Sequence, residues 1–188
     1  MQNGAAIWFC ATRIPDCGGA AIRSQSAVSA REDTILSTQA LADPFDKRVT
    51  LDRDFLLLAN LRGIITDSHF VKRDRMGRLV AFLARIAQDG WARRAKGVGL
   101  DEQTALLVEP DGSGSLRGSG AAYFLSAHTK PELCLSKTPL TYRNLDVYKI
   151  IGSATFNLSR WNSDGGTSYR LSAEAGALTS SQSNGAIY

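Results

Sequence analysis

The chain has 188 residues, a formal net charge of +4, 44% hydrophobic residues and 21% charged residues. This composition predicts one globular domain with a sizeable core, and the small positive charge does not by itself require a nucleic-acid partner. No apolar run reaches the roughly 18 residues of a membrane-spanning helix, and the N-terminal stretch lacks the basic start of a signal peptide. We therefore expect no membrane association and a cytoplasmic protein by default, unless an export signal precedes Met1.

The first predicted elements are short. Residues 4–7 close a strand, and residues 16–22 form a turn of small residues that leads into a helix. A loop with a short helix covers residues 34–55, and residues 62–70 form an apolar strand that ends in polar residues.

A longer helix is predicted from about residue 74 to residue 89, because apolar side chains recur there at intervals of three and four. This apolar stripe consists of Met76, Leu79, Val80, Leu83, Ile86 and Ala87. Three short strands then cover residues 96–125, with a turn at residues 111–114 between the second and the third. Further strands are predicted at residues 146–151 and 167–173.

Strand, helix and strand within about forty residues indicate a parallel unit with a helical crossover. We therefore expect an α/β fold with a Rossmann-like, mostly parallel sheet. Residues 1–125 form the α/β part, and residues 126–188 form a β-rich C-terminal extension of the same domain.

Two polar pairs follow two of the predicted strands. Asp67 and His69 end one strand, and Asp101 and Glu102 follow the next. The carboxyl ends of parallel strands form the ligand-binding edge of an open α/β sheet. An imidazole at this edge can accept a proton, and a carboxylate can orient the ring, so His69 and Glu102 are candidate catalytic residues.

The nucleophile has to come from a third turn, and the best candidate is Cys17. The small residues that follow Cys17 allow a sharp turn that would lift the side chain clear of the sheet. A thiol beside an imidazole is a competent nucleophile. The other cysteines, Cys10 and Cys134, complete neither a metal-ligand pattern nor an even disulfide count, and we predict no metal and no cofactor.

Three arginines follow His69 and are candidates for binding carboxylates. Arg75 and Arg78 are three residues apart and share a helix face, and Arg73 precedes them. Guanidinium groups hold carboxylates through paired hydrogen bonds, which suits an acidic or zwitterionic substrate.

Each of these residues also has an ordinary structural interpretation. A histidine after a strand often only hydrogen-bonds within the fold, and arginines on a helix often form a solvated face. Cys17 is also small enough to be a buried apolar residue. His128 lies in a loop with no acidic or nucleophilic pattern around it and is predicted to be structural.

The stretches "GIITDSHFVKRDRMGRLVAFLARIAQ", "GVGLDEQTALLV" and "GSGAAYFL" resemble the cyanophycinase family of serine peptidases. The resemblance covers roughly residues 17–125 well and the C-terminal extension more loosely. It implies a class I glutamine-amidotransferase-like fold, of which this chain would hold a part, and a Ser-His-Glu triad. It also implies cleavage of cyanophycin to β-Asp-Arg dipeptides.

Carried over to this chain, the resemblance makes His69 the histidine of the triad and Glu102 its acid. It makes Asp67 and the three arginines, Arg73, Arg75 and Arg78, the substrate-binding residues.

The chain departs from the family pattern at the nucleophile. The serine of the family's G-T-S-A-G-A elbow falls on Cys17, and the preceding threonine falls on Asp16. The strands and glycine-rich loop that precede the elbow in the family have no counterpart upstream. We therefore expect an N-terminally truncated member with impaired hydrolysis of its substrate, cyanophycin or another Asp-Arg isopeptide.

Two other classes of protein remain open. The chain is alternatively a non-enzymatic remnant that binds carboxylate-bearing ligands. A nucleic-acid-binding module built on the basic residues at 72–78 and 93–96 ranks last, because few aromatic residues lie among them. The expected partners are thus the isopeptide substrate and, as an allowed arrangement, a second copy in a homodimer, with no nucleic acid and no membrane.

Overall fold

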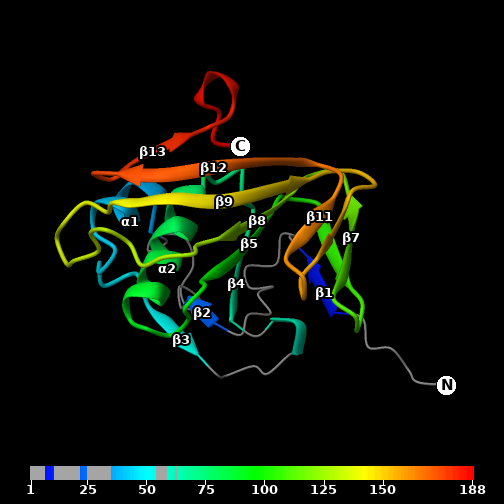
Figure 1. Ribbon diagram of the computed structural model, residues 1–188, viewed down its shortest axis with the longest axis horizontal. Coiled ribbons are helices and arrows are strands. Elements are labelled where there is room, and N and C mark those ends of the chain that lie inside the picture. The colour runs from blue at the N-terminus through cyan, green and yellow to red at the C-terminus, as the bar shows by residue number, and fades with distance from the viewer. Residues whose placement is uncertain (1–6, 11–21, 25–34, 54–58, 62) are drawn as a thin grey trace.

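A computed structural model describes residues 7–10, 22–24, 35–53, 59–61 and 63–188. These residues form two sheets and two α-helices, α1 (Ser37–Ala42) and α2 (Met76–Gln88). Figure 1 shows the helices towards one end of the molecule and strands of the smaller sheet towards the other, with the two long strands β9 and β12 running across both. Short 3-10 helices occur at Ala59–Leu61 and Ser183–Gly185.

The larger sheet has eight described strands in the order β13-β12-β9-β8-β5-β4-β2-β3. In chain order they are β2 (Ile22–Ser24), β3 (Leu51–Arg53), β4 (Ile64–Ser68), β5 (Lys96–Leu100), β8 (Ala122–Ser126), β9 (Tyr142–Ile150), β12 (Thr167–Glu174) and β13 (Ala177–Ser180). The smaller sheet has the order β1-β6-β7-β10-β11. Its strands are β1 (Ile7–Cys10), β6 (Thr104–Val108), β7 (Ser113–Gly118), β10 (Thr155–Asn157) and β11 (Asn162–Asp164).

The predicted α/β class is confirmed, and its central unit is β4–α2–β5. Strands β4 and β5 pair in parallel, from Ile64 opposite Lys96 to Ser68 opposite Leu100. Strand β2 also pairs in parallel with β4, whereas the other described pairs of the larger sheet are antiparallel, so the sheet is mixed where a mostly parallel one was expected. A crossover helix is what two neighbouring parallel strands require.

The prediction of three strands in residues 96–125 is wrong, because this region forms four. The turn at residues 111–114 joins β6 to β7, and this hairpin leaves the larger sheet and belongs to the smaller one. Strand β7 ends at Gly118, which adopts a φ of +109° and where a Cβ would lie 1.9 Å from the carbonyl oxygen of Gln103. Two glycines at 118 and 120 thus divide what reads in the sequence as a single strand.

Of the predicted strand at residues 4–7, only Ile7 is among the described residues, and strand β1 begins there. The small-residue turn at 16–22 lies outside the described residues up to residue 21. Its last residue, Ile22, begins strand β2, so residues 22–24 form a strand and not the start of the expected helix. The predicted strands at 146–151 and 167–173 correspond to β9 and β12, while the proposed division of the chain at residue 125 stays a prediction.

Helix α2 is buried on nearly every side. Its predicted apolar stripe is fully inside, and Arg78, Ala81, Phe82 and Ala84 are buried as well. Helix α1 packs closely against it, because a Cβ on Gly77 would lie 2.7 Å from the side chain of Leu41. Helix α2 ends at Gln88, and just beyond it Gly90 has a φ of +72° and the amide of Trp91 donates to the carbonyl of Ile86 at 3.0 Å.

The larger sheet separates two hydrophobic cores. Its strand β8 sends Tyr123 and Leu125 into the core around α2, and it sends Ala122 and Phe124 into the core shared with the smaller sheet. Phe124 stacks on Phe156 of β10 with ring centroids 3.7 Å apart. The molecule is therefore three-layered, with helices on one face of the larger sheet and the smaller sheet on the other. Among the described residues, neither helix has the length and apolar character of a membrane span.

Candidate active site

The candidate site lies where β4 and β5 end. Because Ser68 and Leu100 are opposite each other, the segments that begin at His69 and Asp101 leave the sheet side by side. The amide of Phe70 donates to the carbonyl of Leu100 at 3.1 Å, which continues the pairing past the strand ends. The expectation that these two segments meet at the carboxyl edge of the sheet is confirmed.

His69 and Glu102 form a direct side-chain pair. The distance from His69 Nδ1 to Glu102 Oε1 is 2.8 Å. His69 is buried, with 8% of the residue exposed, and its φ of +54° is unusual for a residue with a side chain. Uncommon backbone angles are concentrated at functional sites, where the surrounding structure holds them in place.

Lys72 extends the His69–Glu102 pair to a chain of three charged or polar groups. Lys72 was not among the candidate site residues identified from the sequence. Its Nζ lies 3.1 Å from Glu102 Oε2, the oxygen that His69 does not use. Hydrogen bonds from Lys72 and from His69 lower the pKa of Glu102, which keeps the carboxylate ionised as an acceptor for the imidazole. The signal in the sequence that could have identified Lys72 is its position in a run of cations that follows His69.

Asp101 of the β5–β6 connection and Thr104, the first residue of β6, fix the position of Glu102. Asp101 accepts hydrogen bonds from the amides of Val71 and Ala121, both at 3.0 Å, so it ties together the segments around the site. Thr104 Oγ1 donates to the carbonyl of Glu102 at 3.0 Å and accepts from the amide of Gly120 at 2.9 Å. Glu102 therefore sits on a connection that is held at both ends.

Asp67, Arg75 and Arg78 form a buried ionic cluster next to the pair. Arg78 donates to both carboxylate oxygens of Asp67, at 2.7 and 2.6 Å, and Arg75 donates to one at 2.8 Å. The exposed fractions are 6% for Asp67, 9% for Arg75 and 5% for Arg78. Burial opposes ionisation of Asp67, but the two guanidinium groups outweigh it, and the pKa of this carboxyl lies below its usual range.

This cluster corrects the orientation expected for the two arginines. They were predicted to present their guanidinium groups to the carboxylates of a ligand, but in this structure the carboxylate they hold is that of Asp67. The reason is that the helix face beside His69 is packed against the end of β4 and is not open to solvent. Arg73, by contrast, is exposed, and its contribution to ligand binding stays a prediction, as do those of Arg75 and Arg78.

Cys17, the predicted nucleophile, and Asp16 lie outside the described residues, so the role of Cys17 stays a prediction. Cys134 is unsuited to that role, because burial raises the pKa of its thiol to about 11. His128, predicted to be structural, pairs with Asp146 at 2.8 Å on the surface of the C-terminal strands. Within the described ranges, no group of three or more His, Cys, Asp or Glu side chains is arranged to hold a metal ion.

We predict that Gly99→Ala destabilises the protein and displaces His69. A Cβ at this position would lie 2.6 Å from the ring of Phe70, the residue that follows His69. Such overpacking typically costs about 1–3 kcal/mol of unfolding free energy. Urea denaturation measures the loss, and NMR of the imidazole signals reports the displacement.

Gly97→Ala is the matched control for this substitution, because it lies in the same strand. The three atoms nearest to a Cβ there all belong to the side chain of Leu79, at 3.0 to 3.3 Å. This variant should lose less stability and leave the His69 signals in place. Equal effects of the two variants would show that Gly99 has no special relation to the site.

A buried histidine oriented by a carboxylate at the edge of an α/β sheet is the arrangement found in hydrolases that use an activated nucleophile. Comparison with curated proteins agrees with this class. Two proteins named cyanophycinase, from Trichormus variabilis and from Nostoc sp., are each 30% identical to this chain over 99 residues.

The match covers 50% of this chain and 31% of each of these cyanophycinases, so the chain matches less than a third of the length of the curated relatives. No model of a protein family matches the chain. The chain is thus distantly similar to cyanophycinases, and this similarity points to a peptidase-like hydrolase.

Proposed function

We propose that this chain is a cyanophycinase-like peptidase in which His69 is the general base and acid and Glu102 orients it. The observation that carries the proposal is the contact of 2.8 Å between His69 Nδ1 and Glu102 Oε1. With Glu102 ionised as an acceptor, the ring proton belongs on Nδ1, and the lone pair of Nε2 is left to accept a proton.

The proposed reaction has two steps. The nucleophile, predicted at Cys17, attacks the carbonyl carbon of the scissile bond while His69 Nε2 takes the proton of the thiol. The imidazolium then protonates the leaving amine as the carbon–nitrogen bond breaks. In the second step His69 deprotonates a water molecule, which attacks the thioester and releases the acid and the free thiol.

The substrate class that suits this site is an acidic Asp-Arg isopeptide such as cyanophycin. Lys72 and Arg73 are exposed in the turn that His69 begins, so they lie within reach of a ligand that contacts His69. Cations at the rim of a site favour the carboxylates of such a substrate.

The test is release of β-Asp-Arg from insoluble cyanophycin by the purified chain and by two variants, His69→Ala and Glu102→Gln. We expect slow release, because the predicted nucleophile is a thiol that follows Asp16, whose charge disfavours a thiolate. His69→Ala should reduce release to background, and Glu102→Gln should reduce it by roughly 10²- to 10⁴-fold, as expected for loss of the group that orients the base.

Asp146→Asn is the matched control, because it alters the other histidine–carboxylate pair of the chain. This variant should release the dipeptide at the rate of the parent. Release that survives His69→Ala would contradict the proposed mechanism.

A second candidate function is binding of carboxylate-bearing ligands without hydrolysis. The exposed cations Lys72 and Arg73 favour it, because they serve binding whether or not a nucleophile is present. Absence of release from cyanophycin, together with binding of β-Asp-Arg in calorimetry that Arg73→Ala weakens, would support this function over the first.

A further inference from the structure

We propose that Tyr188 is a positioning residue for His69, which it controls by fixing the turn between β4 and α2. The inference rests on the proposed role of His69 as the base. Tyr188 is the last residue of the sequence, and its side chain contacts Met76 at the start of α2. The two residues are 112 positions apart along the chain.

The turn that Tyr188 contacts begins at His69 itself. The amides of Arg73, Asp74 and Arg75 donate to the carbonyls of His69, Val71 and Phe70 at 2.9 to 3.0 Å, which closes the turn on itself. Both His69 and Asp74 have positive φ, at +54° and +46°. A turn with two such residues persists only where neighbouring groups hold it.

The phenol of Tyr188 supplies two of these restraints. It donates to Asp74 Oδ1 at 2.8 Å and accepts from the amide of Met76 at 2.9 Å. The amide of Met76 is one of the donors that the first turn of a helix leaves without a partner inside the helix. The residue before it, Arg75, offers no side-chain cap, so Tyr188 caps α2 from the far end of the sequence.

The aromatic ring of Tyr188 reaches the neighbour of His69. It packs edge-on against Phe70, with centroids 5.9 Å apart, and against Tyr123 of β8, with centroids 5.8 Å apart. Burial raises the pKa of Tyr188, so the phenol stays protonated and remains a donor to Asp74. Phe70 is fully buried, and a shift of its ring would move the backbone that carries His69.

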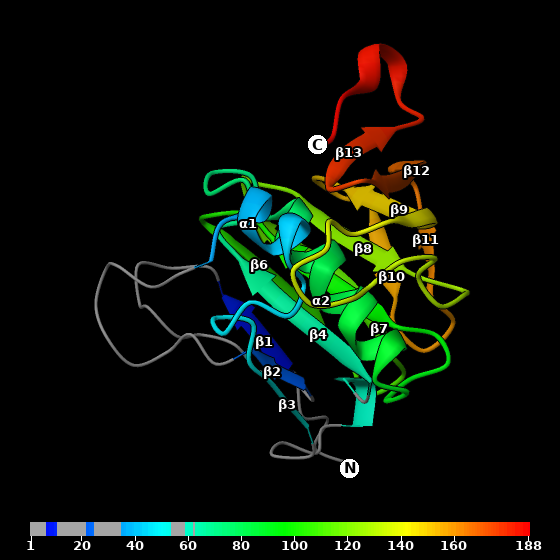
Figure 2. The same cartoon turned by 90° about the vertical axis from the view of Figure 1, so that its left-hand side faces the viewer.

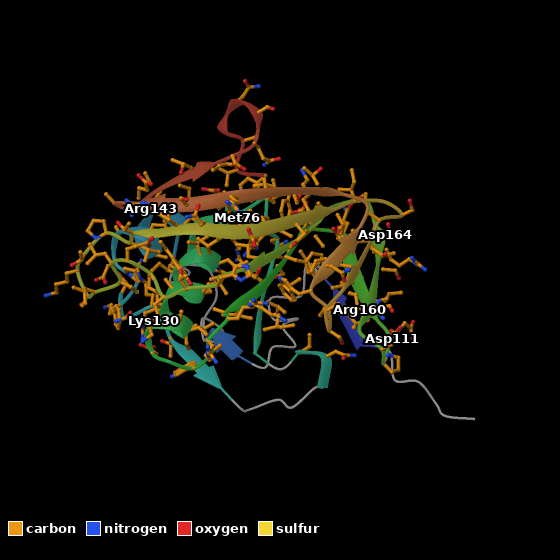
Figure 3. All side chains as sticks on the ribbon, in the orientation of Figure 1. Met76, Asp111, Lys130, Arg143, Arg160 and Asp164 are labelled. Carbon is orange, nitrogen blue, oxygen red and sulfur yellow. The ribbon has the colours of Figure 1, made fainter. Side chains whose placement is uncertain are left out.

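The segment that ends in Tyr188 is fastened to β12 along its way. Arg170 and Ser181 exchange two hydrogen bonds at 2.9 Å, and the hydroxyl of Tyr169 donates to the carbonyl of Ile187 at 2.9 Å. Figure 2 shows this segment projecting beyond β13 before it returns. Figure 3 labels Met76, the first residue of α2, whose amide donates to Tyr188.

Tyr188→Phe tests the proposal, because it removes the hydroxyl and keeps the ring. The chain contains only two histidines, so their imidazole signals in NMR are assigned by comparison with His69→Ala. We expect Tyr188→Phe to shift or broaden the His69 signals and to leave those of His128 unchanged. Tyr169→Phe removes a hydroxyl of β12 that holds the tail at Ile187 but does not contact the turn, so it should affect His69 less.

Hydrolysis provides a second measurement. Tyr188→Phe should lower kcat for β-Asp-Arg release by roughly tenfold to a hundredfold, the range expected when a catalytic group is misplaced by a fraction of an ångström to about one ångström. KM should change little, because the hydroxyl of Tyr188 contacts Asp74 and Met76 and not the exposed cations of the turn.

Three outcomes would overturn the proposal. They are His69 signals that do not respond to Tyr188→Phe, signals of both histidines that respond alike, and a Tyr188→Phe variant that fails to fold. The NMR result needs no substrate, so it is separable from the proposed function. If His69→Ala leaves hydrolysis intact, the function fails, while a selective response of His69 to Tyr188→Phe still shows that Tyr188 controls the position of this ring.

Discussion

Asp67→Asn is expected to lower the free energy of unfolding by about 3–5 kcal/mol at neutral pH. Asp67 is the only carboxylate recorded against the guanidinium groups of Arg75 and Arg78 within the described residues, and all three side chains are buried. An amide of the same shape leaves two buried cations without a counter-charge, and breaking a buried ion pair from one side has this cost. Urea unfolding of the parent and the variant measures the difference.

The same substitution has a predictable pH dependence. Because the folded-state pKa of Asp67 is lowered, its contribution to stability is present above the ordinary carboxyl pKa of about 4 and is lost as pH falls through the lower folded-state value. Asp67→Asn has no such group, so the stabilities of the two proteins should converge at acidic pH. A constant difference between them from pH 7 to pH 2 would show that charge pairing is not what Asp67 contributes.

Asp46→Asn is the matched control, because Asp46 also pairs with an arginine. Its carboxylate lies 2.8 Å from Arg48, and this contact lowers the pKa of Asp46 to about 2. Its side chain is 23% exposed, so water screens the pair. We expect a loss of under about 1 kcal/mol. A loss as large as that of Asp67→Asn would contradict the importance of burial.

Leu83→Ala is expected to lower the free energy of unfolding by about 2–5 kcal/mol. Leu83 is fully buried in the middle of α2, within the core that the helix shares with the larger sheet. Removing its branched end forfeits the burial of apolar surface and leaves a cavity that a close-packed interior closes only in part. Thermal or urea unfolding of the variant measures the loss.

Leu135→Ala removes the same atoms from a leucine that is 54% exposed. It should stay within about 0.5 kcal/mol of the parent, as surface substitutions usually do. A Leu83→Ala variant that unfolds at the same urea concentration as Leu135→Ala would show that the interior face of α2 is wrongly assigned.

The sequence determined the β4–α2–β5 unit and the burial of Leu79 and Leu83. This unit is local, and the spacing of apolar residues along one segment carries the information. The sequence also predicted that His69 and Glu102 lie at the same edge of the sheet, because each follows a strand and neighbouring parallel strands end together. Their contact of 2.8 Å follows from that topology together with the turns that hold each residue.

Only the tertiary structure decided where Arg75 and Arg78 point. Two arginines three residues apart look the same in a sequence whether they face a ligand or a buried acid. Their partner Asp67 lies on the preceding strand, and the pairing is set by how the helix packs on the end of that strand. The pattern therefore identified the residues but not the group that they hold.

The separate position of the β6–β7 hairpin and the return of Tyr188 to α2 were likewise decided by tertiary structure. Short apolar runs do not say which of two sheets they join, since either sheet buries the same face. The contact between Tyr188 and Met76 spans 112 residues and leaves no periodic trace in the sequence. Local periodicity thus determined the elements and the ends of the strands, whereas long-range packing decided which side chains meet at the site, because contacts between distant segments depend on the assembled fold.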